Sequence, residues 1–196
     1  MIHKTYKIKI EVSPEEARVL DEQSRIVNGV YNYCVAKSRE WKAQYIEARQ
    51  NGETAKAKAI GKKLYSKYGY RDLIPSLRLI RPWLAKVNSR PIRDAALRVA
   101  QAIKRHQSGA KNGQKGAKMA WPTFHKWSNE RWASLGFDDG QGIKLVGRTL
   151  RISLGGRNNY VYARLAEPAP FGTTPFNQYG PYCQRTRCFL CLFYDW

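Results

Sequence analysis

TYKIKIEVSPEEA (residues 5–17) places an alternating segment directly before a helix start, and this junction decides the fold. Tyr6, Ile8 and Ile10 share one face of the alternating part, which is typical of a half-buried β-strand. Ser13 is a suitable N-cap for the helix that follows. Because a lone strand is not stable, we expect this one to pair with strands later in the chain.

Helical patterns follow the first strand. Apolar residues at helical spacing predict one long helix that ends near Gly52 and a shorter helix closed by Gly69. Prolines between residues 70 and 91 predict short helical pieces and turns there. SRPIRDAALRVAQAIKRHQ (residues 89–107) then has a continuous apolar stripe, which predicts a helix that Ser89 caps. Glycines from position 109 onward predict a basic loop.

The hydrophobic period changes after Trp121. GIKLVGRTLRISLGG (residues 142–156) predicts two strands around a turn, and residues 159–165 and 187–196 predict two more. The Pro- and Gly-rich residues 166–182 predict a loop between the last two strands. The expected fold class is therefore α+β, a small β-barrel interrupted by a helical insertion.

The charge balance is the strongest indication of function. The chain has 35 Lys and Arg against 15 Asp and Glu, a net charge of +20 at pH 7. Such a field repels itself unless a polyanion neutralises it. No run of about 18 apolar residues predicts a membrane span, and the charged N-terminus does not resemble a signal peptide. We therefore expect a nucleic acid as the partner, not a membrane; a merely basic soluble protein is the alternative.

Four cysteines, Cys34, Cys183, Cys188 and Cys191, do not form the two close pairs that structural zinc usually needs. In the last predicted strand, Cys188 and Cys191 would face opposite sides. We favour ordinary buried thiols over the alternative of a zinc site, and expect no metal and no cofactor. Nothing in the spacing demands disulfides, so a cytoplasmic location is expected.

Four segments together resemble one family in their order and spacing. They are residues 6–41, with Val-Tyr-Asn at its centre, the helix of residues 89–107, KMAWPTFHKW (residues 118–127) and residues 142–154. In that order they are similar to the N-terminal part of TnpB (OrfB) proteins, the transposon-encoded RNA-guided nucleases, and of compact type V CRISPR effectors. Ala120 stands where the family has glycine.

The resemblance implies an oligonucleotide-binding-like barrel, called the wedge, that holds a helical recognition lobe. Residues 1–12 would form the first wedge strand, residues 13–117 the recognition lobe and residues 118–196 the rest of the wedge. In such proteins these modules bind a guide RNA and read a short motif beside the double-stranded DNA target. The family's RuvC nuclease domain would begin near Trp196, so the resemblance implies a truncated or split effector.

We expect no cleavage by this chain alone. Two-metal hydrolysis needs several converging carboxylates, and Asp138, Asp139 and Asp195 do not make such a set in the predicted fold. No catalytic residue and no metal ligand is therefore predicted. A separate RuvC-type nuclease chain or a second copy of this chain would be the further partner.

The resemblance also assigns the DNA-reading positions. The helix of residues 89–107 would approach the target-adjacent duplex with Ser89, Arg90 and Arg93, and arginine can bond guanine bidentately. Tyr70 and Arg71 are expected close by. A phosphate contact or a solvated helix face is the alternative for these residues.

The RNA contacts are expected on basic and aromatic residues. The acid-free segment from residue 104 to 118 suits a phosphate backbone, and tryptophans suit base stacking. Trp121 and Phe124 are instead expected to plug the barrel. The full set of predicted RNA contacts is Lys7, Lys9, Lys104, Arg105, Lys111, Lys115, Lys118, Trp127, Arg131 and Trp132.

Two other functions fit the same composition. One is a stand-alone DNA-binding protein of helix-turn-helix type, associated with a transposon or acting as a transcriptional regulator. The other is a structural RNA-binding protein of ribosomal type. Bound RNA of defined length would favour a guide-binding module, whereas RNA-free protein with duplex affinity would favour the first alternative.

Overall fold

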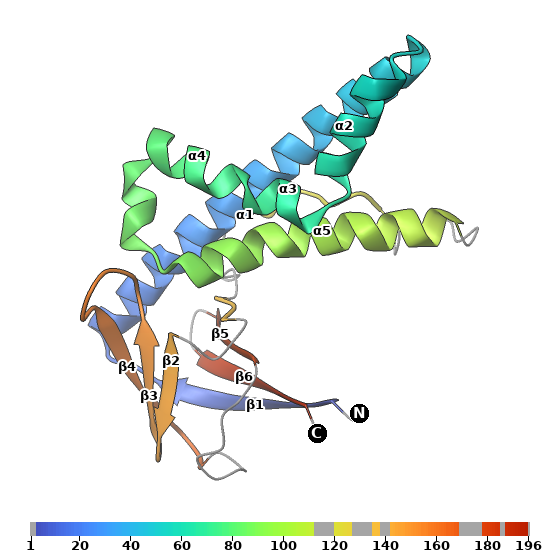
Figure 1. Cartoon of the computed structure of the whole chain (residues 1–196). Coiled ribbons are helices and arrows are strands. Elements are labelled where there is room, and N and C mark those ends of the chain that lie inside the picture. The colour runs from blue at the N-terminus through green and yellow to red at the C-terminus, as the bar shows by residue number, and fades with distance from the viewer. Residues whose placement is uncertain are drawn as a thin grey trace. The chain divides into compact units, whose positions relative to one another are not determined.

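The computed structural model describes residues 3–111, 120–126, 135–137, 142–168, 178–184 and 187–195. These residues form helices and one antiparallel sheet, so the predicted α+β class is confirmed (Figure 1). The chain divides into two compact units. The sheet unit comprises Met1–Asn28, Pro82–Asp94 and Lys126–Trp196; the helical unit comprises Gly29–Arg81 and Ala95–His125. The wedge and recognition-lobe boundaries stay a prediction.

The helices lie where the sequence patterns place them, with shifted ends. Their bounds are α1 (Pro14–Gln50), α2 (Thr54–Leu64), α3 (Lys67–Arg71), α4 (Leu73–Ile80), the 3₁₀-helix η1 (Pro82–Lys86) and α5 (Ser89–Lys111). α1 and α5 each contribute residues to both units.

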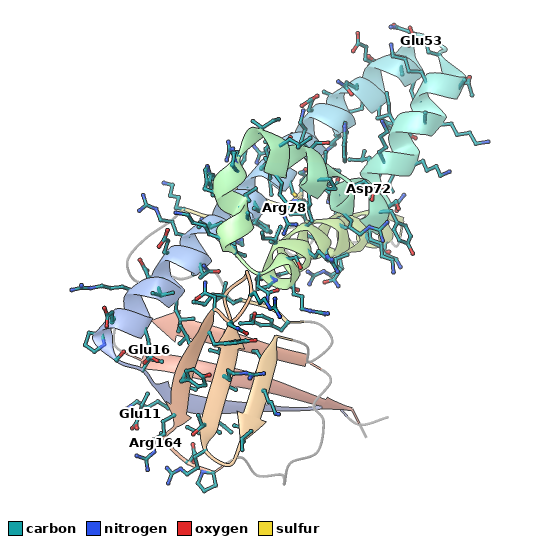
Figure 2. The ribbon with its side chains drawn as sticks, turned by 60° about the vertical axis from the view of Figure 1, so that its left-hand side comes forward. Glu11, Glu16, Glu53, Asp72, Arg78 and Arg164 are labelled. Atoms are coloured by element: carbon teal, nitrogen blue, oxygen red, sulfur yellow. The ribbon has the colours of Figure 1, made fainter. Side chains whose placement is uncertain are left out.

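The first turn of α1 is fixed by a capping box. The Ser13 hydroxyl accepts a hydrogen bond of 3.2 Å from the Glu16 backbone N–H, and the Glu16 carboxylate accepts one of 2.9 Å from the Ser13 N–H. The same carboxylate also accepts a hydrogen bond from the backbone N–H of Tyr162 in the sheet; Figure 2 labels Glu16. Partial burial would raise the pKa of Glu16, but these hydrogen bonds outweigh it and lower the pKa. Helix start and sheet are thus joined within the sheet unit.

The end of α1 confirms the predicted stop at Gly52. Its φ of 73° lies in the left-handed region, which glycine adopts without strain. The Glu53 N–H donates to the Ala48 carbonyl at 2.9 Å, and the Gly52 N–H donates to Arg49 at 3.3 Å. This is the hydrogen-bond pattern of a Schellman motif, so the helix ends by its own chemistry.

The predicted end of the second helix at Gly69 is wrong. α2 stops at Leu64, and Gly69 lies inside the separate helix α3. The cause is Ser66, whose hydroxyl accepts a 3.1 Å hydrogen bond from the Tyr68 N–H and caps a new helix. The short pieces predicted for residues 70–91 are confirmed as α3, α4 and η1.

α5 follows its predicted stripe but differs at both ends. Asn88, not Ser89, caps the helix, because its side-chain oxygen accepts a 3.0 Å hydrogen bond from the Arg90 N–H. Pro91 occupies the third helical position, where a backbone N–H has no helical partner. Gly109 lies within the helix, so the loop predicted from that glycine onward begins later. The predicted apolar face is buried at Ile92, Ala95, Ala96, Val99 and Ile103.

The sheet has the order β2-β3-β4-β1-β6-β5, with every neighbouring pair antiparallel. Ile10 of β1 (His3–Glu11) faces Leu165 of β4 (Tyr160–Leu165) on one side and Cys188 of β6 (Arg187–Asp195) on the other. The prediction that the first strand rejoins later strands is confirmed. The sheet is open among the described strands, and closure into a barrel stays a prediction.

The remaining strands are β2 (Ile143–Val146), β3 (Thr149–Ser153) and β5 (Gln178–Gln184). β5 lies in the segment predicted as a loop, because Gly180 and Pro181 are poor strand formers. Among the described strands it lies at the edge of the sheet, where proline is tolerated. Ile8 and Ile10 are buried as predicted, and Leu150, Ile152 and Leu154 are buried as well.

Oppositely charged partners and close glycine packing complete the sheet unit. Glu11 on β1 is the register partner of Arg164 on β4, an arrangement that favours the observed pairing (Figure 2).

After β3, Gly155 has a φ of 117° and lies against the turn that precedes α5. A β-carbon there would lie 2.7 Å from the carbonyl carbon of Val87 and 2.9 Å from the nitrogen of Asn88. The start of α5 is therefore seated on the sheet hairpin by backbone contact.

Gly155→Ala is expected to lower the free energy of unfolding by at least about 2 kcal/mol, because backbone strain of about 1–3 kcal/mol adds to a backbone clash. Gly156→Ala is the matched control: its φ is 77° but no atom lies within 4 Å of the added carbon. That variant should lose only about 1 kcal/mol. Urea unfolding followed by circular dichroism measures both, and equal losses would contradict the close contact.

Candidate nucleic-acid interface

The positive charge is concentrated in the helical unit. That unit carries 18 Lys and Arg against four Asp and Glu, so it holds +14 of the net +20. Three of its four acids, Glu40, Glu53 and Asp72, already form ion pairs with a neighbouring Lys or Arg. The unit therefore keeps a large excess of positive charge, which favours contact with a nucleic acid.

The aromatic segment, Ala120–Lys126, is fixed to α1 by one asparagine. The Asn32 side chain donates to the His125 carbonyl at 2.9 Å and accepts from the His125 N–H at 2.8 Å. Both backbone groups of His125 are thereby satisfied, as a strand partner would satisfy them. The His125 ring also stacks on Tyr31, with ring centroids 4.0 Å apart and planes 11° from parallel. The Val-Tyr-Asn motif of the sequence thus holds a segment that lies 93 residues away.

The rest of the aromatic segment contacts the next turns of α1. The Trp121 indole N–H donates to the Ser38 hydroxyl at 3.0 Å, and the Lys42 ammonium lies 4.4 Å from the Trp121 ring centroid. The Arg39 guanidinium lies 4.5 Å from the centroid of Phe124, whose side chain is 46% exposed. The prediction that Trp121 and Phe124 plug the barrel is therefore wrong: both belong to the helical unit and rest on α1.

These contacts follow one another along α1. Lys42, Arg39 and Asn32 meet Trp121, Phe124 and His125 in that order, so the aromatic segment runs antiparallel to the helix. From residue 42 to residue 31 an α-helix rises about 16 Å. Two of these contacts, Lys42 with Trp121 and Arg39 with Phe124, combine a cation with an aromatic ring. Proteins use the same combination to bind single-stranded nucleic acids.

Burial and nearby arginines determine the protonation of His125 and Tyr31, the stacked pair of rings. Burial, and then the positive charge of Arg98, lowers the pKa of His125 below its usual 6.5, so its ring is neutral at pH 7. Burial raises the pKa of the Tyr31 hydroxyl, while Arg98 and Arg105 act against this. The stacked pair is therefore uncharged at neutral pH, and the positive charge at this site comes from arginine and lysine.

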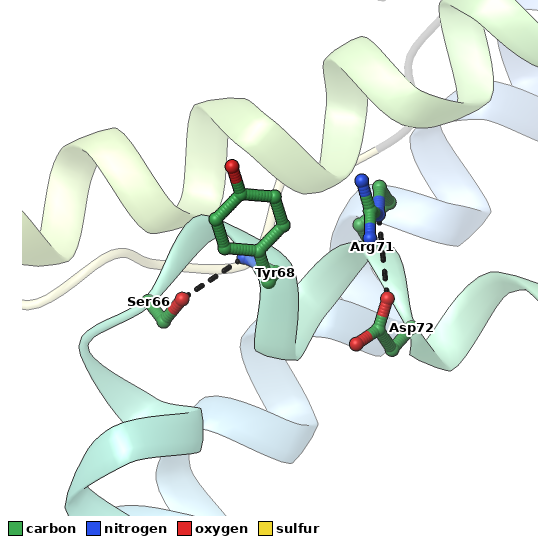
Figure 3. A network of polar contacts seen from close by, with 4 residues as sticks. All are labelled: Ser66, Tyr68, Arg71 and Asp72. Carbon is green, nitrogen blue, oxygen red and sulfur yellow. Dashed lines mark hydrogen bonds and ion pairs between the residues drawn. The ribbon is translucent and has the colours of Figure 1, made fainter.

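A second cation–aromatic group lies on α3 (Figure 3). Tyr68 is 51% exposed, and the Arg71 guanidinium lies 4.7 Å from its ring centroid. The Lys67 ammonium lies 5.2 Å from the same centroid. Asp72 pairs with Arg71 at 3.3 Å, and Ser66 caps the short helix beneath the ring. Arg71, a predicted DNA contact, is thus exposed beside an accessible aromatic ring.

Tyr70 is not placed as predicted. Its side chain is fully buried, and its hydroxyl donates to the Leu64 carbonyl at 3.0 Å. Its ring packs against Trp41, with centroids 5.3 Å apart, and burial raises the pKa of its hydroxyl. A fully buried ring offers no surface to DNA, so we remove Tyr70 from the candidate contacts. The exposed tyrosine of this pair is Tyr68.

The predicted DNA-reading residues lie together at the start of α5, in the sheet unit. Ser89 and Arg90 are partly exposed and Arg93 is exposed. Pro91 and Ile92 between them are buried, which holds this first turn in place. The structure therefore brings Ser89, Arg90 and Arg93 to one helix end.

The predicted RNA contacts are scattered. Lys9 is exposed on β1 in the sheet unit, and Lys104 and Arg105 are exposed on α5 in the helical unit. Lys7 lies in β1 and Lys111 ends α5, but their side chains lie outside the described ones. Lys115, Lys118, Trp127, Arg131 and Trp132 lie outside the described residues.

The predicted thiols can be placed only in part. Cys34 is a buried free thiol, as predicted, and burial raises its pKa to about 12. Cys183 and Cys188 are register partners in β5 and β6, and Cys191 lies in β6 opposite Gly180. The side chains of these three cysteines lie outside the described ones.

Sequence reasoning missed the cation–aromatic pairs. Arg39 and Lys42 lie three residues apart, as neighbours on one helix face do, but this spacing alone does not indicate their aromatic partners. In the sheet unit, Arg151 lies 4.5 Å from the ring centroid of Tyr160, a cross-strand neighbour that a β3–β4 hairpin register would have suggested. The partners of Arg39 and Lys42 come from residues 121–124, and no local pattern reveals that contact.

Comparisons with known proteins add no relative: no family model and no curated protein matches this chain. The resemblance to TnpB-type proteins therefore stays a prediction. Within the described helices, none is long and apolar enough to cross a membrane. Among the described residues, no group of three or more His, Cys, Asp or Glu side chains could hold a metal ion.

Tyr70→Phe is expected to cost about 1 kcal/mol of folding free energy, because it removes a buried hydrogen bond. Tyr68→Phe, the matched control on the same helix, should change stability by less than about 0.5 kcal/mol, because its hydroxyl is on the surface. Urea unfolding of both variants measures the difference. A neutral Tyr70→Phe would contradict the buried hydroxyl contact.

Proposed function

We propose that this chain binds RNA through its helical unit, as the guide-RNA-binding module of a TnpB-like or type V CRISPR-like system. The observation that carries the proposal is the concentration of +14 on that unit, together with exposed aromatic rings beside cations. Phosphate backbones supply the opposite charge, and bases supply flat faces for the rings. Residues 95–129 strengthen the argument, since they contain seven Lys or Arg and no acid.

The DNA-facing part of the proposal is the start of α5. Ser89, Arg90 and Arg93 would read a short motif beside the double-stranded target; Arg71, in the helical unit, is a separate candidate DNA contact. The first turn is held by the Asn88 cap and by its close contact with Gly155, so its side chains leave from a fixed backbone. A fixed backbone favours base reading over loose phosphate contact, because bidentate bonds to guanine need a defined geometry.

The finer features of the proposal concern the sheet and the chemistry. We propose that the sheet unit is the wedge, an oligonucleotide-binding-like barrel whose first strand is β1. We also propose that the chain does not cut nucleic acid by itself and acts with a separate RuvC-type nuclease chain or a second copy. The pairing of β1 with β4 and with β6 supports the assignment of the sheet unit as the wedge. In a barrel interrupted by a helical insertion, the first strand must pair with strands that follow the insertion.

The first test is RNA binding and its salt dependence. Protein purified without nuclease treatment should carry RNA of defined length, and its affinity for that RNA should fall steeply with salt. Replacing Lys111, Lys115 and Lys118 together by Ala should flatten the slope of log K against log salt by about one unit per lost phosphate contact.

The matched control for the salt test is a triple change of the exposed Lys58, Lys62 and Lys63 on α2, which removes the same charge. A basic-loop contact predicts a smaller change of slope in this control than in the variant at positions 111, 115 and 118. Equal slopes in the two variants would show that only net charge matters. Protein that neither carries nor binds RNA would refute the proposed function.

The second test is sequence reading by Arg93, the exposed arginine of the α5 start. With RNA-loaded protein and a randomised duplex library, Arg93→Ala should relax preference at one position and cost roughly 1–3 kcal/mol there. Arg90→Ala is examined in the same library. Arg157→Ala removes the same charge from an exposed loop of the sheet unit and should leave the preference unchanged. Identical preferences in all variants would restrict these arginines to phosphate contacts.

A further inference from the structure

We propose that the ring of Phe124 stacks on an unpaired base of the bound RNA, beside the Arg39 guanidinium. This inference rests on the proposed RNA binding and names the part of the RNA that this site takes. Of the three described rings in the aromatic segment, Phe124 differs from its neighbours. Trp121 is partly buried and donates a hydrogen bond to Ser38, and the exposed His125 ring is already stacked on Tyr31, whereas the Phe124 ring is 46% exposed beside a guanidinium.

The exposed ring stands on a fixed backbone. Asn32 holds the N–H and the carbonyl of His125, the next residue, at 2.8 and 2.9 Å. Pro122, two residues before Phe124, is buried, and its ring fixes φ. Trp121 is tied to Ser38 on the other side. Little backbone freedom is therefore left to lose when a base stacks on the ring, which favours binding.

The cations beside the ring select a nucleotide over an apolar partner. The Arg39 guanidinium lies 4.5 Å from the ring centroid, and Lys42 follows one turn later along α1. An apolar protein surface would have to desolvate these charges, whereas a nucleotide brings a phosphate to them. The ring and its neighbours thus match the two parts of a nucleotide, a flat base and an anionic backbone.

The geometry favours an unpaired base. In an RNA duplex both faces of each base are covered by stacking, and the major groove is too deep and narrow for a side chain to enter. A phenylalanine ring meets a base face only where the base is splayed out of a helix, in a loop, a bulge or an end. The Phe124 site would therefore recognise single-stranded RNA and leave duplex RNA to the general positive field.

The test compares Phe124→Leu, which keeps an apolar side chain but removes the flat ring, with Phe124→Trp, which keeps a ring. The probes are an unstructured 12-nucleotide RNA that carries 2-aminopurine and an RNA duplex of the same length. We expect Phe124→Leu to bind the single strand about 5- to 100-fold more weakly than wild type and the duplex equally well. Phe124→Trp should restore the affinity and the quenching of 2-aminopurine.

Leu79→Ala is the matched control, because Leu79 is another exposed apolar residue of the helical unit. It should leave single-strand affinity unchanged, and thermal unfolding should show that all variants are folded. Wild-type affinity and quenching in Phe124→Leu would overturn the stacking inference, while the proposed RNA binding would stand on its salt dependence. Absence of RNA binding by the wild type would overturn both.

Discussion

The pairing of β1 on both of its edges is the constraint on which the structure depends. β1 is the third strand counted from the β5 edge, with β4 on one side and β6 on the other. The chain must therefore leave the sheet after Glu11 and return to it with the strands that follow residue 142. The helices that the structure describes between these points belong to a segment of the chain that leaves the sheet after β1 and returns to it at β2. The capping box that joins Ser13, Glu16 and Tyr162 fixes the first step of that segment.

The sequence predicts the elements that depend on local chemistry. The stop at Gly52, the face of Ile8 and Ile10 and the apolar stripe of α5 all follow from patterns within a few residues, and the structure agrees. The errors come from competition between local signals. Asn88 and Ser89 are both good caps, and the structure places the cap at Asn88, in the turn that packs against Gly155.

The candidate site was harder to predict because its parts meet only in three dimensions. Tyr68 and Tyr70 are two residues apart, and composition alone does not show that one is buried against Trp41 while the other lies beside Arg71. The fixing of His125 by Asn32 depends on a contact across 93 residues, which no periodicity reveals. The basic character of the helical unit, by contrast, could be read directly, because charge adds up whatever the fold.

The pairing of Ile10 with Leu165 has a consequence during synthesis. At about 5–20 residues per second, the ribosome delivers β4 roughly 8–30 s after β1, so the first strand waits with both edges unpaired. Unpaired strand edges invite aggregation, and lysines on an edge oppose it. Lys7 and Lys9 alternate with Ile8 and Ile10 in β1. Their charge thus opposes aggregation of the nascent chain until β4 and β6 have been synthesised.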